Sequence, residues 1–165
     1  MCAPAGWASA ELNQGVGVEA ALPANATTGD PQVNLDSVSC WAAGECQAVG
    51  KYADGAGAGR GLLIGRSSGA WGAGAEAPLP GNAEPTNPGA ILNSVSCVSA
   101  GECAAVGVYN DSSPQVQGLL LTRSGGAWAP AVEATLPGNA SSPPGGLSGQ
   151  RLVRVGRELR RRRDL

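Results

Sequence analysis

Two pairs of cysteines are the residues whose type and spacing point most directly to chemistry. Cys40 pairs by spacing with Cys46 and Cys97 with Cys103, which leaves Cys2 without a partner. Residues that face each other across an antiparallel hairpin have Cα atoms about 4.5–5.5 Å apart, a distance that a disulfide spans. We predict one hairpin-closing disulfide in each pair, which indicates an oxidising compartment. Free thiols and a four-cysteine zinc site are the alternatives, although zinc pairs favour closer spacing.

The other polar residues favour structural roles over catalysis. The chain contains no histidine, which excludes a serine or cysteine nucleophile activated by an imidazole. A sialidase-like site gathers several arginines on a carboxylate, and the body of the chain offers Arg60, Arg66 and Arg123. Asp54 and Asp111 lie in equivalent loops where turn formation is favoured, because a calcium site needs more carboxylates. We therefore predict no enzyme activity, no cofactor and no bound metal.

Two tryptophans recur at one position of the sequence pattern. Trp71 and Trp128 carry much of the aromatic bulk in a chain that has no phenylalanine. An exposed tryptophan can stack on a sugar ring, whereas a buried one contributes a large packing surface. We predict that Trp71 and Trp128 pack between neighbouring repeats, with carbohydrate stacking as the alternative.

An internal repeat of 57 residues supplies the elements that hold these side chains. Residues 22–78 and 79–135 align without a gap and are identical at 29 positions, and a further copy begins at Leu136. Residues 1–21 resemble the end of an earlier copy. Alternating apolar residues and turn formers predict four strands in the second copy, over residues 92–97, 103–109, 116–123 and 127–136.

Four short antiparallel strands in each copy describe the blade of a β-propeller. The expected fold is all-β, with tandem four-stranded antiparallel blades of an incomplete β-propeller and a basic C-terminal tail outside the core. Residues 1–21 are then the remnant of a preceding blade, 22–78 and 79–135 the two blade repeats, and 136–165 the start of a third. Because propellers close with about four or more blades, two blades leave exposed strands, and we expect edge-to-edge self-association.

The motif order SVSC…C-AVG-Y…GLLL-R-SGGAW, found in full in the second copy, resembles repeats of secreted bacterial β-propeller proteins. It is similar to the neuraminidase-repeat (Asp-box, or BNR-like) superfamily over residues 22–140. The resemblance implies blades in which a Val-Gly pair ends the second strand and a Gly-Gly turn precedes the fourth. The box of that superfamily is mainly structural, so the resemblance implies no catalysis.

We expect a noncatalytic repeat fragment of a secreted or surface protein that binds carbohydrate or protein. A fragment of an extracellular, sialidase-like glycosidase and a nonfunctional truncated product are the alternatives. No apolar run is long enough to span a membrane, and no signal peptide is recognisable in this chain. Because the predicted disulfides indicate an oxidising compartment, the parent protein is expected outside the cell or on its surface.

The basic C-terminal tail departs from the rest of the chain. Residues 1–149 carry four cations and eleven acids, a net charge of −7, whereas residues 150–165 carry seven arginines and two acids, a net charge of +5. If each codon is read one base late, GC-rich codons for this tail permit S-V-S-C-V-S-A-G-S-C-A-A-V-G. That order matches residues 94–107 at every position but one. We interpret the tail as a third repeat in a shifted frame and expect no nucleic-acid partner. A basic arm for nucleic acid or anionic lipid is the alternative.

Overall fold

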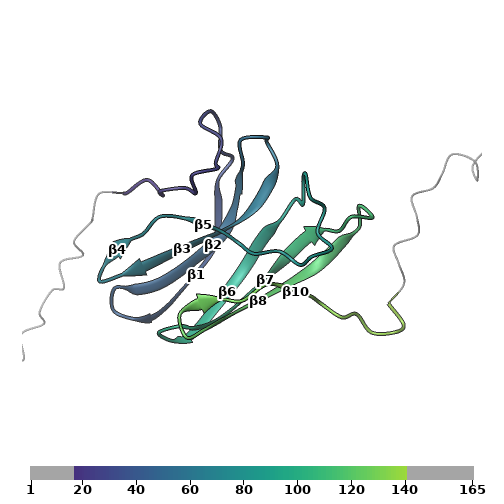
Figure 1. Cartoon of the computed structure of the whole chain (residues 1–165). Helices are drawn as coiled ribbons and strands as arrows, with labels where there is room; N and C mark the ends of the chain where they lie inside the picture. The colour runs from purple at the N-terminus through teal and green to yellow at the C-terminus, as the bar shows by residue number, and fades with distance from the viewer. Residues whose placement is uncertain (1–16, 141–165) are drawn as a thin grey trace, which may run out of the picture. The chain divides into compact units, whose positions relative to one another are not determined.

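The computed structural model describes residues 17–140, which form β-strands and no helix (Figure 1). The expectations for residues 1–16 and 141–165, including Cys2 and the basic tail, lie outside the described residues. The prediction of an all-β fold with antiparallel strands is confirmed. The strands form two sheets, one in each full copy of the repeat, and across residues 17–140 the sheets do not close into a ring.

The first sheet lies in the first copy of the repeat. Its strands are β1 (Asn34–Ala42), β2 (Glu45–Ala53), β3 (Gly59–Ser67), β4 (Ala70–Trp71) and β5 (Ala75–Glu76). Strands β1, β2 and β3 are antiparallel neighbours in chain order, and β4 and β5 both pair with β3. The tight turn between β1 and β2 contains Gly44 at a φ of 78°, in the left-handed region that favours glycine.

The second sheet repeats the first at an interval of 57 residues. Its strands are β6 (Ile91–Ser99), β7 (Glu102–Asn110), β8 (Val116–Ser124), β9 (Ala127–Trp128) and β10 (Val132–Glu133). The order is again β6, β7 and β8, with β9 and β10 both paired with β8. The two copies therefore share the same strand register as well as the same sequence pattern.

The fourth extended segment of the second copy differs from the prediction. One strand was expected over residues 127–136, but the chain forms two short strands, β9 and β10. Pro130 lies between them, and proline has no N–H to donate to a neighbouring strand. The first copy has the same gap between β4 and β5 with Ala73 at the equivalent place, so the interruption belongs to the repeat and does not require the proline.

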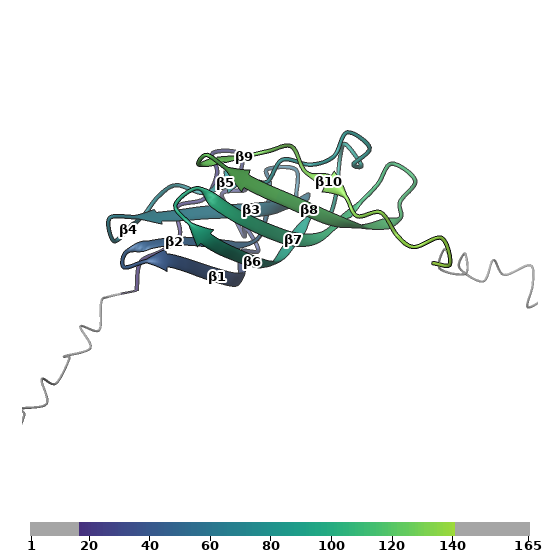
Figure 2. The same cartoon turned by 90° about the horizontal axis from the view of Figure 1, so that it is seen from below.

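The two sheets pack against each other through β6. In both views β6 runs beside β1 and β2 (Figures 1 and 2), and it contacts both strands. Val49 and Leu63 of the first sheet join one buried cluster with Ala105, Tyr109 and Leu121 of the second sheet. Burial of these apolar surfaces is the main contribution that holds the two copies together.

Hydrogen bonds across the same contact fix how the copies are aligned. The Ser37 hydroxyl of β1 accepts a hydrogen bond from the Val95 N–H of β6 at 3.3 Å. The Ser39 hydroxyl accepts one from the Cys97 N–H at 3.0 Å. Because both acceptors lie on one strand and both donors on the next, β1 and β6 are held in one register.

A glycine is required at the same place in the second strand of each copy. A Cβ atom added at Gly50 would lie 1.9 Å from the Asn34 carbonyl oxygen, and one added at Gly107 would lie 1.9 Å from the Ile91 carbonyl oxygen. In both copies an irregularity in strand pairing follows directly, where the register shifts between Leu35 and Ser37 and between the equivalent residues. At the Val-Gly pair of the sequence motif, the neighbouring backbone thus leaves no room for a side chain.

Candidate functional site

Each cysteine pair closes the first hairpin of its sheet. Cys40 lies opposite Cys46 in the β1–β2 register, and the two sulfur atoms are 1.99 Å apart. Cys97 lies opposite Cys103, and their sulfur atoms are 2.09 Å apart. Both pairs are thus at the distance of a disulfide bond, which is compatible with an extracellular location. The described part of the chain has no helix that is long and apolar enough to cross a membrane.

A buried tyrosine in each sheet organises a cluster that the sequence analysis missed. The Tyr52 hydroxyl lies 2.8 Å from Asn25 Oδ1 and 3.1 Å from Glu76 Oε2, and the Asn25 amide donates to the same carboxylate at 2.8 Å. The loop before β1, strand β2 and strand β5 are therefore tied together at one point. The signal was present in the sequence, because asparagine, tyrosine and glutamate recur at the 57-residue interval.

The second sheet repeats this cluster with nearly the same distances. The Tyr109 hydroxyl lies 2.9 Å from Asn82 Oδ1 and 3.0 Å from Glu133 Oε2, and the Asn82 amide donates to Glu133 at 2.7 Å. Burial, and after it the neighbouring Glu76 carboxylate, together raise the pKa of Tyr52 to about 12. Burial and then the hydrogen bond with Glu133 raise the pKa of Tyr109. Both phenols are therefore neutral at ordinary pH and act as hydrogen-bonding groups.

Titration of the two tyrosines should report these clusters directly. The chain has only two tyrosines, so the tyrosinate absorbance of the folded protein should appear well above pH 10, whereas in denaturant it should appear near the ordinary pKa of about 10. Because the folded pKa is the higher one, the unfolded chain loses its protons first, and stability should fall as pH rises from about 10 to about 12.

The variant Glu76→Gln is the matched control for this titration. It should lower the pKa of Tyr52 and leave that of Tyr109 in place, because it removes the carboxylate from one cluster only. A folded chain in which both tyrosines titrate near pH 10 would contradict the buried clusters.

The equivalent aspartates organise turns. The Asp54 carboxylate accepts hydrogen bonds from the N–H groups of Ala56 and Ala58, each at 2.9 Å, and from Arg60 Nε at 2.8 Å. These hydrogen bonds, the Ala58 N–H first, hold the pKa of Asp54 below its usual value. Asp111 has the same arrangement, with Gln117 in place of the arginine, and a lowered pKa. Among residues 17–140 no group of three cysteine, aspartate or glutamate side chains is placed to hold a metal ion.

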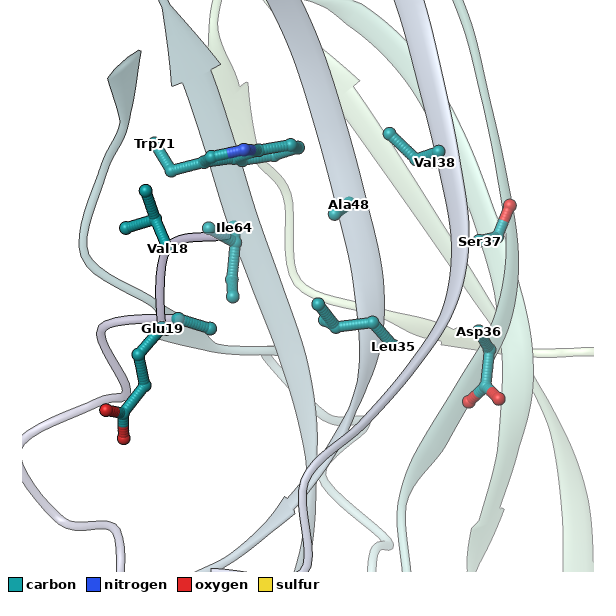
Figure 3. A pocket seen from close by; sticks show the side chains of 10 residues that line it. Val18, Glu19, Leu35, Asp36, Ser37, Val38, Ala48, Ile64 and Trp71 are labelled. Atoms are coloured by element: carbon teal, nitrogen blue, oxygen red, sulfur yellow. The ribbon is translucent and has the colours of Figure 1, made fainter. Parts of the chain in front are cut away.

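An apolar pocket of about 370 Å³ opens on the face of the first sheet that points away from the second (Figure 3). Ala48 and Ile64 form its floor, Leu35 and Val38 of β1 line one side, and Trp71 lies across its top. Trp71 is exposed there, whereas the equivalent Trp128 is partly buried against the cluster between the sheets.

A groove of about 680 Å³ lies at the hairpin ends of both sheets. Trp41 and Trp71 line it, together with Arg66 and Arg123. Arg123 comes from the second sheet, yet its guanidinium carbon lies 5.9 Å from the centre of the Trp41 ring in the first. Arg66 lies at the same distance from Trp71. The packing of the two copies thus creates a site that neither copy has alone.

Hydrogen bonds hold the two groove arginines in place. Arg66 donates through Nε to the Gly69 carbonyl oxygen at 3.1 Å, and Arg123 donates through Nε to the Gly126 carbonyl oxygen at 3.0 Å. Arg60 lies elsewhere and pairs with Asp54. The structure therefore brings two of the three candidate arginines together. Comparison of the chain with protein-family models, with curated proteins and with solved structures finds no match.

Proposed function

We propose that this chain is a noncatalytic β-propeller-type repeat module of a secreted or surface protein, and that it binds an acidic carbohydrate in the groove between its two sheets. The single observation that carries this proposal is the composition of the groove. Two tryptophans and two arginines line it, three of them from the first copy of the repeat and Arg123 from the second. Indoles stack on sugar rings, and guanidinium groups recognise carboxylates.

The charges of the groove favour an anionic ligand. Arg66 and Arg123 bring two positive charges to it, and Glu45 brings one carboxylate. That carboxylate is already engaged, because it accepts a hydrogen bond from the Ser68 N–H at 2.6 Å. The Nε atoms of both arginines are used by the hairpins, which leaves the outer nitrogens to face a ligand. A sugar acid matches this arrangement better than a neutral sugar.

Calorimetric titration with glucuronic acid and with glucose tests the proposal, because the two sugars differ by one carboxylate. Glucuronic acid should bind more tightly, and its affinity should fall as the salt concentration rises. The variant Arg123→Leu should weaken binding of the acid about tenfold, since it removes a charge-assisted hydrogen bond. Lys51→Leu is the control, because it removes a cation that does not line the groove.

Equal binding of both sugars, or an equal loss in the two variants, would contradict recognition by the groove arginines. Failure of both sugars to bind would count against a carbohydrate-binding role altogether. The sialidase-like alternative predicts in addition that the chain releases free sugar from a sialoside, and product analysis of the same mixtures would detect that.

A further inference from the structure

The two sheets have the same sequence pattern, but each leaves a different face uncovered. The pocket face belongs to the first sheet and consists of Leu35, Val38, Ala48 and Ile64. The outer face belongs to the second sheet and consists of the exposed residues Val98, Val106 and Leu120. Comparison with the equivalent residues of the other copy, 57 positions away, indicates what each face fits.

The residues of the pocket face have equivalents in the second sheet that are buried, because the first sheet covers them. The equivalents of its members are Leu92, Val95, Ala105 and Leu121, and all four belong to the cluster between the sheets. Leu35 is 48% exposed, whereas Leu92 is completely buried. The first sheet lies on Leu92, whereas in the described residues no further sheet lies on Leu35.

The residues of the outer face have equivalents in the first sheet, and those equivalents cover the second sheet. Trp41, Val49 and Leu63 are the equivalents of Val98, Val106 and Leu120, and they pack in the cluster between the sheets. Leu63 is 4% exposed, whereas Leu120 is 43% exposed. The outer face therefore corresponds in position to the surface with which the first sheet covers the second.

Part of the pocket face is already covered by the chain itself. Ala20, Leu22 and Ala26 pack against the first sheet, as their equivalents 57 positions later pack against the second. The pocket is the remaining space, and the equivalent residues of the second sheet share one buried cluster with Val49 and Leu63 of the first. Another sheet would fill this space with two aliphatic side chains, and Val106 on β7 and Leu120 on β8 of a second copy are the equivalents of Val49 and Leu63.

The polar groups of the interface are also repeated. Ser37 and Ser39 accept hydrogen bonds from the N–H groups of Val95 and Cys97 within the chain. Their equivalents on β6, Ser94 and Ser96, are exposed. The matching N–H groups in the first sheet belong to Val38 and Cys40, at the β1 edge beside the pocket. One chain therefore carries the hydroxyl acceptors on β6 and the N–H donors on β1 that a second set of these hydrogen bonds needs.

We infer that the chain binds a second copy of itself head to tail, so that the outer face of one copy covers the pocket face of the next. Val106 and Leu120 of one copy enter the pocket of the other, and Ser94 and Ser96 bond to its β1 edge. Such an interface joins two different faces, so it extends into a chain of copies or closes into a ring. Rings of two to four copies would hold about four to eight sheets, the usual range for propellers.

One substitution makes this interface weaker than the one within the chain. Arg123 lies over Trp41 between the sheets, but the residue equivalent to Trp41 on the outer face is Val98. Arg66 of the next copy would therefore meet a valine. Val98→Trp restores an indole for that guanidinium and should tighten association about threefold to fivefold, the usual size of a cation–π contact at an accessible site.

Sedimentation velocity of the full chain over a range of concentrations tests the inference. The wild-type chain should associate reversibly, and Leu120→Asp and Val38→Asp should each weaken association at least about a hundredfold, because each buries an unpaired charge. Both positions are exposed in the single chain, so both variants should fold. Leu136→Asp is the matched control, because Leu136 is exposed and belongs to neither face.

An equimolar mixture of the two aspartate variants is the decisive measurement. Each variant keeps one intact face, so the mixture should form a dimer of one copy of each and nothing larger, with the affinity of the wild-type contact. A mixture that stays monomeric, a wild-type chain that stays monomeric at high concentration, or a Leu120→Asp chain that still associates would each overturn the inference. The last result would point to pairing through strand edges. None of these outcomes depends on whether a sugar binds in the groove.

Discussion

Replacing Leu92 with alanine should lower the free energy of unfolding by about 3 kcal/mol, within the range for a fully buried leucine that leaves a cavity. Leu92 comes from β6 and is completely buried between the two sheets. Its side chain lies close to Gly61, in β3 of the other sheet. Urea unfolding of the full chain, at a concentration where it is monomeric, measures the change through the midpoint of the transition.

Leu35→Ala is the matched control, because Leu35 has the same place in the first copy but no sheet covers it. Its substitution should cost less than about 1 kcal/mol, since a half-exposed side chain loses less apolar contact. Equal losses for the two variants would mean that the sheets fold without support from each other. A large loss for Leu92 alone would show that the stability of each copy depends on its neighbour, as in other repeat proteins.

Replacing Gly107 with alanine should destabilise the chain by about 3 kcal/mol, at the upper end for a residue that forces packed groups apart. The added Cβ would lie 1.9 Å from the Ile91 carbonyl oxygen and 2.9 Å from its carbon atom. That carbonyl belongs to a residue that pairs with Val108 in the same ladder, so it cannot move away without loss of strand pairing. Circular dichroism during thermal unfolding provides the measurement.

Gly65→Ala is the control for a strand glycine without such a contact. The nearest atom to its added Cβ, other than those of its chain neighbours, is Gln47 Oε1 at 3.9 Å. Alanine is less flexible than glycine in the unfolded chain, so this variant should be as stable as the wild type or slightly more stable. If Gly107→Ala behaved like Gly65→Ala, β6 and β7 would not approach each other as closely as described.

Much of the fold could be predicted because the sequence repeats. Identical residues 57 positions apart must occupy equivalent places, so one reading of turn formers and alternation served for both copies. The long strands were recognised, although they extend beyond the predicted 92–97 and 103–109 by one or more residues. The fourth segment of the second copy was predicted as one strand, whereas in both copies it forms two short strands, with Ala73 in the first copy where the second has Pro130.

The candidate site was harder to predict, for a reason that also comes from the repeat. Trp71 and Trp128 are equivalent in sequence, yet Trp71 is exposed and Trp128 is partly buried. Their difference is set by whether another sheet lies alongside, which a local pattern does not contain. The same holds for the groove, since Arg123 and Trp41 meet only because two copies pack. Contacts within one copy could be predicted from its sequence pattern, whereas contacts between the two copies could not.

The strongest internal ties of each sheet are repeated within each 57-residue unit. Each disulfide, each tyrosine cluster and each aspartate-centred turn is complete inside residues 22–78 or inside residues 79–135. Unequal recombination between the DNA copies would therefore gain or lose a whole unit without cutting any of these bonds. A gene built in this way can change its length in steps of 57 codons, and every product keeps its internal cross-links.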